Sequence, residues 1–194
     1  MHSFSGRIEI LGRALPPSGD MRAFRAAGGR YVPADRRAEG LIPSLSVAEN
    51  LALPSPPGRF FLDRPSLRRS ASQRIARFGV RASSPEAPAS ELSGGNQQKL
   101  VLARELDASS RPSRLLVAIH PTRGLDIAAS GDVHGRIEDA RRKGCAVLIV
   151  SSDPEEARLF GGTFRVVYRG ALSEPLPADT PFHVLGRRMA GLAA

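Results

Sequence analysis

A serine followed by two glycines lies near the middle of the chain, where the pattern indicates the start of a helix. Residues 92–99 read LSGGNQQK. The first turn of a helix gathers unpaired backbone N–H groups and the positive end of the helix dipole, and glycines leave room for close approach. Ser93, Gly94 and Gly95 can therefore bind a phosphate group, with the Ser93 hydroxyl as a further donor and Gln97 on the following turn. A loop that only caps a helix is the alternative for an isolated Ser-Gly-Gly, but the full string is more specific.

The composition favours a globular domain with a buried core. The chain has 194 residues, of which 41% are hydrophobic and 24% charged, and disorder does not fit this balance. No apolar run approaches the roughly 18 residues that span a bilayer, and the first residues do not resemble a signal peptide. We therefore expect a cytoplasmic protein. The single cysteine, Cys145, lies in an apolar run, and we expect it to be a small core residue.

The positive net charge suggests nucleic acid as a partner, but it supports this suggestion only weakly. The net charge is +9, but nearly all of the 28 basic residues are arginines scattered along the chain, and aromatic residues make up only 5%. We expect no nucleic-acid partner. The alternative, a basic nucleic-acid-binding module, requires salt-dependent binding to oligonucleotides.

Hydrophobic patterning predicts alternating strands and helices. Two continuous apolar runs, 115–119 and 145–150, flank a predicted helix over 127–143. This pattern is typical of a βαβ unit whose parallel strands are buried on both faces. Further strands are predicted at 7–11, 30–33 and 165–168, and further helices near 18–28, at 46–51, 65–78, from the serine–glycine string to 106, at 154–159 and at 181–192.

Turn and cap signals separate these elements. Ser46 and Glu49 form a capping-box pattern at the start of a helix. Residues 53–58 and 82–90, rich in proline and serine, are predicted loops, the first of them flexible. We find no internal repeat and no boundary that would split the chain in two.

The string at 92–99 resembles the signature of ABC transporter ATPases, in the variant form of importers of simple sugars and nucleosides. The resemblance covers almost the whole chain. It includes YVPADR at 31–36, GL at 40–41, LSVAENL at 45–51, FGVR at 78–81, PEAP at 85–88, PTRGLD at 121–126 and MAG at 189–191.

This resemblance implies an α/β fold, an incomplete ABC-ATPase (P-loop NTPase-like) domain with a mostly parallel sheet and a helical signature subdomain. Residues 1–194 would form a partial ABC domain, the C-terminal one of such a subunit. Residues 40–107 or so would be the helical signature region, and residues 1–39 and 108–194 the remainder of the catalytic core.

Most groups that hydrolyse ATP in this family have no counterpart in the sequence. A P-loop needs Gly-Lys before Ser or Thr, and no such string occurs. Since the family places the P-loop upstream of the segment matching 5–11, we expect a chain truncated before it. The acidic pair aligns with Ile119 and His120, the loop glutamine with Ala34, and the switch histidine with Ser152. We therefore expect no catalytic residue and no metal ligand, and no hydrolysis by the chain alone.

What remains is one half of an ATP site. In the resembled family, ATP lies between the P-loop of one domain and the signature of another. The resemblance implies that Ser93, Gly94, Gly95 and Gln97 contact the phosphates of ATP in trans, with Mg²⁺ on the partner's side. Asp126 would belong to the D-loop that joins the two domains.

The resemblance also implies partners and a location. The partners would be a second ABC ATPase domain and membrane permease subunits, the latter contacted near residues 41–51, and the chain would lie on the inner face of the cell membrane. The alternative is an inert remnant. Without the P-loop strand and helix, apolar faces of strands 115–119 and 145–150 would be exposed.

Overall fold

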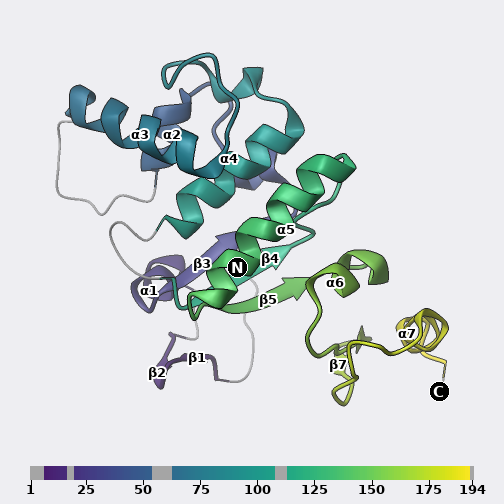
Figure 1. Cartoon of the computed structure of the whole chain (residues 1–194). Helices are drawn as coiled ribbons and strands as arrows, with labels where there is room; N and C mark the ends of the chain where they lie inside the picture. Colours follow the sequence, from purple (N-terminus) through teal and green to yellow (C-terminus); the bar gives the residue numbers. More distant parts are fainter. Residues whose placement is uncertain (1–6, 17–19, 54–62, 108–112, 193–194) are drawn as a thin grey trace. The chain divides into compact units, whose positions relative to one another are not determined.

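A computed structural model describes residues 7–16, 20–53, 63–107 and 113–192 (Figure 1). The chain divides into two compact units, Met1–Leu148 and Ile149–Ala194. We expected no such boundary. The division falls inside a strand, so no linker composition marks it in the sequence. No helix within the described ranges is long and apolar enough to cross a membrane.

A three-stranded sheet organises the first unit. Its strands are β3 (Gly29–Val32), β4 (Leu115–Ile119) and β5 (Ala146–Val150), in the order β3-β4-β5. Strands β3 and β4 are parallel. Helix α5 (Ile127–Arg142) connects β4 to β5, as the apolar runs predicted. The α/β class and the mostly parallel sheet are thus confirmed.

The two apolar strands are buried to different degrees. In β4, Leu116 and Ala118 are buried and the alternate residues are half-buried. In β5, by contrast, Leu148 is 52% exposed. The prediction of burial on both faces is therefore wrong for β5, which is an edge strand of the described sheet and is not covered on the face that carries Leu148. Cys145, just before β5, is buried as predicted.

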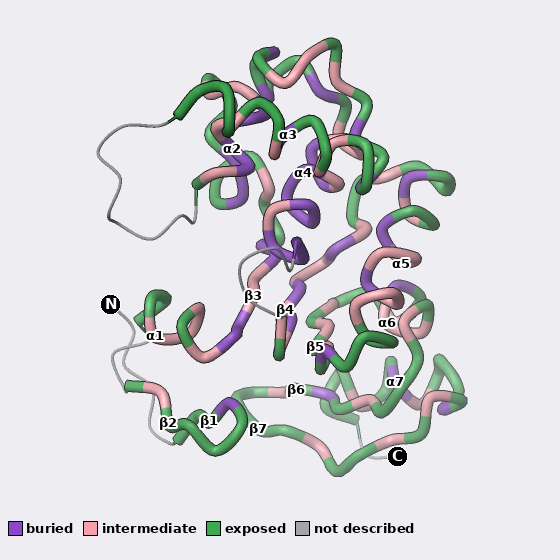
Figure 2. Tube along the Cα trace, turned by 60° about the vertical axis from the view of Figure 1, so that its left-hand side comes forward, coloured by how far each residue is buried: buried purple, intermediate pink, exposed green. Residues whose placement is uncertain are grey.

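Helix α4 (Gly94–Leu106) contributes more buried residues than any other described helix of the first unit (Figure 2). It packs against α2 (Val47–Ala52), α3 (Arg64–Phe78), α5 and β3. Leu100 and Leu102 on α4 are completely buried. Because α4 contacts both the other helices and the sheet, its position fixes where the string at 92–99 begins.

Local caps set the helix starts. Ser46 and Glu49 form the predicted capping box of α2. Asp63 caps α3, whose first turn contains Pro65. Helix α1 (Met21–Ala26) begins after a cap at Asp20, later than the predicted start near Ser18, which lies outside the described residues. The loop predicted at 53–58 lies outside them from residue 54 onward.

Three short elements of the first unit were not predicted. The strand predicted at 7–11 is confirmed in part as β1 (Glu9–Ile10), which forms a tight antiparallel hairpin with the unpredicted strand β2 (Arg13–Ala14). A π-helical turn, η1 (Arg36–Gly40), follows β3. A short 3₁₀ turn, η2 (Ala89–Glu91), immediately precedes the signature string.

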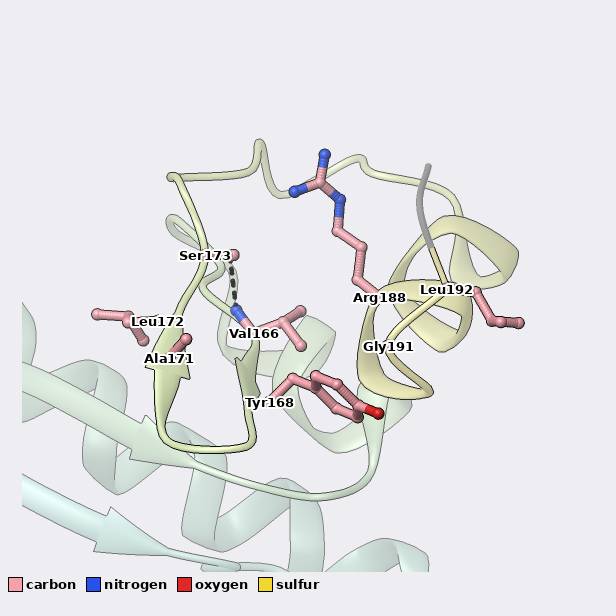
Figure 3. A pocket seen from close by; sticks show the side chains of 8 residues that line it. All are labelled: Val166, Tyr168, Ala171, Leu172, Ser173, Arg188, Gly191 and Leu192. Atoms are coloured by element: carbon pink, nitrogen blue, oxygen red, sulfur yellow. Dashed lines mark hydrogen bonds between the residues drawn. The ribbon is translucent and has the colours of Figure 1, made fainter.

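The second unit contains α6 (Pro154–Phe160), the antiparallel hairpin of β6 (Val167–Tyr168) and β7 (Ala171–Leu172), and α7 (Phe182–Met189). Strand β7 was not predicted. An open hollow of about 440 Å³ lies between this hairpin and α7, and Figure 3 shows the side chains that line it. Its lining is mainly apolar, and the hydroxyl of Ser173 already accepts a 2.9 Å hydrogen bond from the Val166 amide. This arrangement brings no set of reactive groups together.

A buried carboxylate ties α4 to the elements before the sheet. The side chain of Glu105 has no exposed surface. It accepts hydrogen bonds from Arg25 Nη1 at 2.7 Å and Nη2 at 3.1 Å, and from Arg104 Nε at 3.0 Å. A buried charge is tolerated only with such partners. Glu105 therefore anchors the C-terminal half of α4 to α1.

We predict that Glu105→Gln destabilises the protein by about 3–5 kcal/mol, because it leaves cationic partners beside a neutral amide. Urea denaturation measures this change. The matched control is Glu86→Gln, which breaks the exposed pair of Glu86 with Arg68 and should cost less than about 1 kcal/mol. Equal losses for the two variants would contradict the anchoring role.

Candidate functional site

Ser93 is the N-cap of α4 and is exposed. Its Oγ accepts hydrogen bonds from the Asn96 amide at 3.4 Å and from Asn96 Nδ2 at 2.9 Å. Both bonds use the acceptor capacity of the hydroxyl, so its proton is left to be donated to another acceptor. The residue is thus oriented by its own helix while presenting a donor to the outside.

Asn96 connects this cap to a neighbouring segment. Its Oδ1 accepts a 2.8 Å hydrogen bond from the Arg81 amide, just beyond α3. The same side chain therefore holds both the hydroxyl of Ser93 and the backbone after α3. The position of the Ser93 hydroxyl therefore depends on Asn96 and on the segment after α3 as well as on the rotamer of Ser93.

The two glycines of the string are explained by close packing within the chain. A Cβ on Gly94 would lie 2.5 Å from Arg36 Nη2, and one on Gly95 would lie 2.8 Å from the Cβ of Ala129. Neither distance is possible for real atoms without movement. Gly94 thus admits a guanidinium from η1, and Gly95 admits the first turn of α5.

Gln97 lies on the inner side of this arrangement. It is 1% exposed. Its Nε2 donates to the Ala89 carbonyl at 3.2 Å, and its Oε1 accepts from Arg37 Nε at 3.4 Å. In this conformation the amide cannot reach a ligand outside the protein. It instead fastens the turn η2 before the string and the turn η1 beside it.

Lys99 is also occupied within the chain. Its Nζ lies 2.5 Å from Asp132 Oδ2 and so joins α4 to α5. The hydrogen bond from Lys99 lowers the pKa of the Asp132 carboxyl. Lys99 therefore links the two helices.

Asp126 begins the helix that touches the string. Its Oδ1 accepts a 2.7 Å hydrogen bond from the Ala129 amide, which makes it the N-cap of α5. Ala129 is the residue that packs against Gly95. The structure therefore brings the predicted D-loop residue and the predicted signature into one region, on adjoining helix ends. Ile127, beside Asp126, is 94% exposed.

Sequence reasoning did not single out Arg36. Its Nη2 is the atom nearest to the Gly94 position, and its Nη1 donates to the Arg123 carbonyl at 3.5 Å. The guanidinium therefore lies between the string and the segment that leads to Asp126. The only signal in the sequence was its place in the YVPADR string, which carries no spatial information.

The positions aligned with missing hydrolytic groups offer no metal site of their own. Ile119 ends β4, and His120 follows with a positive φ of 46°, a conformation that histidine adopts more often than most residues. Ala34 is exposed and has no polar side chain. Among the described residues, no group of three or more His, Cys, Asp or Glu side chains could hold a metal ion.

Solved structures with the same architecture are ATP-binding cassettes. A dimeric cassette, MJ0796, in a post-hydrolysis state bound to ADP and Pi superposes with a TM-score of 0.71, covering 90% of this chain and 74% of the cassette. A second dimeric structure of that bacterial ABC transporter cassette gives a TM-score of 0.69. Since both are 22% identical to this chain, they establish the fold alone. The class of the fold is therefore that of an ABC cassette.

Relatives identified by sequence show which kinds of ABC protein the chain is similar to. The ribose import ATP-binding protein RbsA 1 of Rubrobacter xylanophilus is 36% identical over 98% of this chain, and the nucleoside import ATP-binding protein NupA of Lactococcus lactis is 37% identical over 96%. No family model matches the chain. The chain is a partial ABC domain whose relatives are ribose and nucleoside import ATP-binding proteins. It spans 38% and 37% of the length of these two relatives.

We predict that Gly95→Ala costs about 1–3 kcal/mol of stability, because the new methyl group meets the Cβ of Ala129 and pushes α4 from α5. The control is Gly131→Ala on α5, where a Cβ meets nothing within 4 Å. That variant should gain about 0.5–1 kcal/mol, as alanine replaces glycine in a helix. Thermal unfolding monitored by circular dichroism measures both. A neutral Gly95→Ala would show that the helices are not held this closely.

Proposed function

We propose that this chain supplies the signature face of an ATP site completed by a second ABC domain, within an importer of simple sugars or nucleosides. The observation that carries the proposal is the exposed Ser93 hydroxyl, oriented by Asn96 at the start of α4. The relatives are named for ribose import and nucleoside import with ATP binding, and these names support the same role.

The start of α4 suits the end of a triphosphate. The amides of Gly94 and Gly95 belong to the first turn, where the helix provides no backbone acceptor, and the helix dipole adds partial positive charge. Ser93 contributes the hydroxyl proton. Hydrogen bonds to a charged phosphate are stronger than those between neutral groups. Ser93, Gly94 and Gly95 would therefore close over the terminal phosphate of ATP held by the partner.

Gln97 has a different role from the one that the signature alone implied. Because it is buried and bonded to the Ala89 carbonyl and Arg37, we assign it the task of holding the loop before Ser93. Asp126 would keep the start of α5 against Gly95 and so place the D-loop beside the partner. Neither side chain needs to touch ATP.

In this proposal the chain binds ATP but does not cleave it. Ile119 cannot bind Mg²⁺, and Ala34 and Ser152 carry neither the amide nor the imidazole expected at their positions. Mg²⁺, the P-loop and the group that positions water would belong to the partner domain. ATP itself supplies the phosphate that bridges the two domains.

A rigid surface near α2 supports the proposed permease contact. Asn50 is completely buried. Its Oδ1 accepts from the Ile42 amide at 2.9 Å, and its Nδ2 donates to the carbonyls of Ile42, Leu45 and Ser46 at 3.0–3.1 Å. One side chain thus fixes the loop before α2. We propose that this loop meets the permease at the inner face of the membrane.

An inert remnant is the second candidate, and the exposure of Leu148 on β5 favours it. The two candidates differ in the stability that they require. A sharp, cooperative unfolding transition of the isolated chain would argue against a remnant, whereas a broad transition would support it.

A composite ATPase tests the proposed role. The partner is an ABC domain of a ribose-import ATP-binding protein with an intact P-loop, whose own signature serine is changed to arginine. We predict that the wild-type chain restores ATP hydrolysis to this partner and that Ser93→Arg does not, because the bulky cation fills the phosphate position. Phosphate release measures the rate, and loss of one such donor typically costs 10²–10³-fold.

The control variant is Ser72→Arg, which adds the same side chain at an exposed position of α3. It should restore hydrolysis as well as the wild type does. If Ser93→Arg restores the same rate as Ser72→Arg, the signature is not part of the site and the proposed function is wrong.

A further inference from the structure

We propose that Arg36 is a further ligand of the terminal phosphate, placed beside the signature to favour a nucleoside triphosphate over a diphosphate. This inference rests on the proposed function. It adds a side chain from η1 to donors that otherwise come only from the start of α4.

The guanidinium of Arg36 occupies the space that Gly94 leaves open. Its Nη2 is 2.5 Å, and its Cζ 3.5 Å, from the place where a Cβ on Gly94 would be. A phosphate bound to the Gly94 amide would therefore lie within reach of the same guanidinium. The missing side chain at Gly94 is what lets the cation and the helix start share one site.

Arg36 has more donors than its neighbours within the chain use. Its Nη1 makes one long hydrogen bond, 3.5 Å, to the Arg123 carbonyl, and its Nε is buried without a hydrogen-bond partner among the described residues. Arginine carries five N–H donors, and a buried donor without a partner is costly. The buried Nε is not within reach of a ligand, but a phosphate with several acceptor oxygens would use the remaining N–H donors on Nη1 and Nη2.

The turn that carries Arg36 is held in place. Asp35 caps η1 by accepting the Arg37 amide at 2.9 Å and the Ala38 amide at 3.1 Å. These bonds lower the pKa of Asp35, first through Ala38. At the far end of η1, Gly40 lies close to Val101 of α4, where a Cβ would be 3.3 Å away. Because both ends of η1 are fixed, the backbone that carries Arg36 is held beside the signature.

The Arg36 guanidinium and the start of α4 together suit the terminal phosphate of ATP. Guanidinium binds phosphate oxygens with two parallel hydrogen bonds, whereas a lysine acts as a point charge. In the composite site the signature closes over the end of the nucleotide that lies farthest from the base. A diphosphate lacks that group, so Arg36 would discriminate between ATP and ADP by contact with the γ-phosphate alone.

A purely structural role for Arg36 makes different predictions. If the side chain only fastened the Arg123 carbonyl, its loss would lower stability and reduce the maximal rate without changing nucleotide preference. If it binds phosphate, its loss raises the ATP concentration needed for half-maximal hydrolysis. It would also weaken ATP-dependent association with the partner while leaving the ADP-dependent association unchanged.

The composite ATPase described above provides the test. We expect Arg36→Ala to raise the half-saturating ATP concentration about tenfold, the loss of one charge-assisted contact, with an unchanged melting temperature. Arg36→Lys should give a half-saturating ATP concentration between those of the wild type and Arg36→Ala, since lysine keeps the charge but loses the paired geometry. The control is Arg69→Ala, which removes a positive charge from an exposed position on α3 and should match the wild type.

The possible outcomes distinguish a failure of the Arg36 proposal from a failure of the proposed function. If Ser93→Arg is inactive while Arg36→Ala matches the wild type, the signature functions and the Arg36 inference is wrong. The inference is also wrong if Arg36→Ala and Arg69→Ala change ATP dependence equally, or if Arg36→Ala only lowers the melting temperature. If the wild-type chain restores no hydrolysis, the proposed function fails and this inference fails with it.

Discussion

The close approach of α5 and of the Arg36 side chain to the start of α4 is the constraint on which the site depends. Gly95 lets the first turn of α5 come near, and Gly94 lets the Arg36 guanidinium lie against the helix start. An added methyl group at Gly95 would force α4 and α5 apart, whereas one at Gly94 would displace the end of the Arg36 side chain. The two glycines thus serve the packing of the chain itself.

Polar contacts along α4 keep this approach in register. Asn96 holds the Ser93 hydroxyl and the segment after α3, Lys99 joins α5 through Asp132, and Glu105 joins α1 through Arg25. Each contact lies on a different face or turn of one helix. The contacts of α4 with the buried core therefore fix the position of the exposed Ser93 at its start. A signature that closes over ATP held by another domain requires such a fixed position.

The elements that sequence predicted best are those with a local cause. The capping box at Ser46, the end of α4 near Leu106 and the βαβ unit around α5 all follow from short patterns of caps and periodicity, and all were confirmed. The burial of β5 was not predictable, since it depends on what covers a strand rather than on its own residues. The burial of Gln97 and the position of Arg36 were not predictable for a similar reason, because only the fold shows that one points inward and the other lies over Gly94.

The central claim is that this chain closes over ATP held by a second domain. Hydrogen–deuterium exchange of the backbone amides from Gly94 to Gln97 tests it most directly. The account predicts slower exchange at Gly94 and Gly95 when a hydrolysis-deficient partner domain and ATP are both present, and no change with ATP or the partner alone. Exchange that stays the same with both present, or that slows with ATP alone, would contradict it.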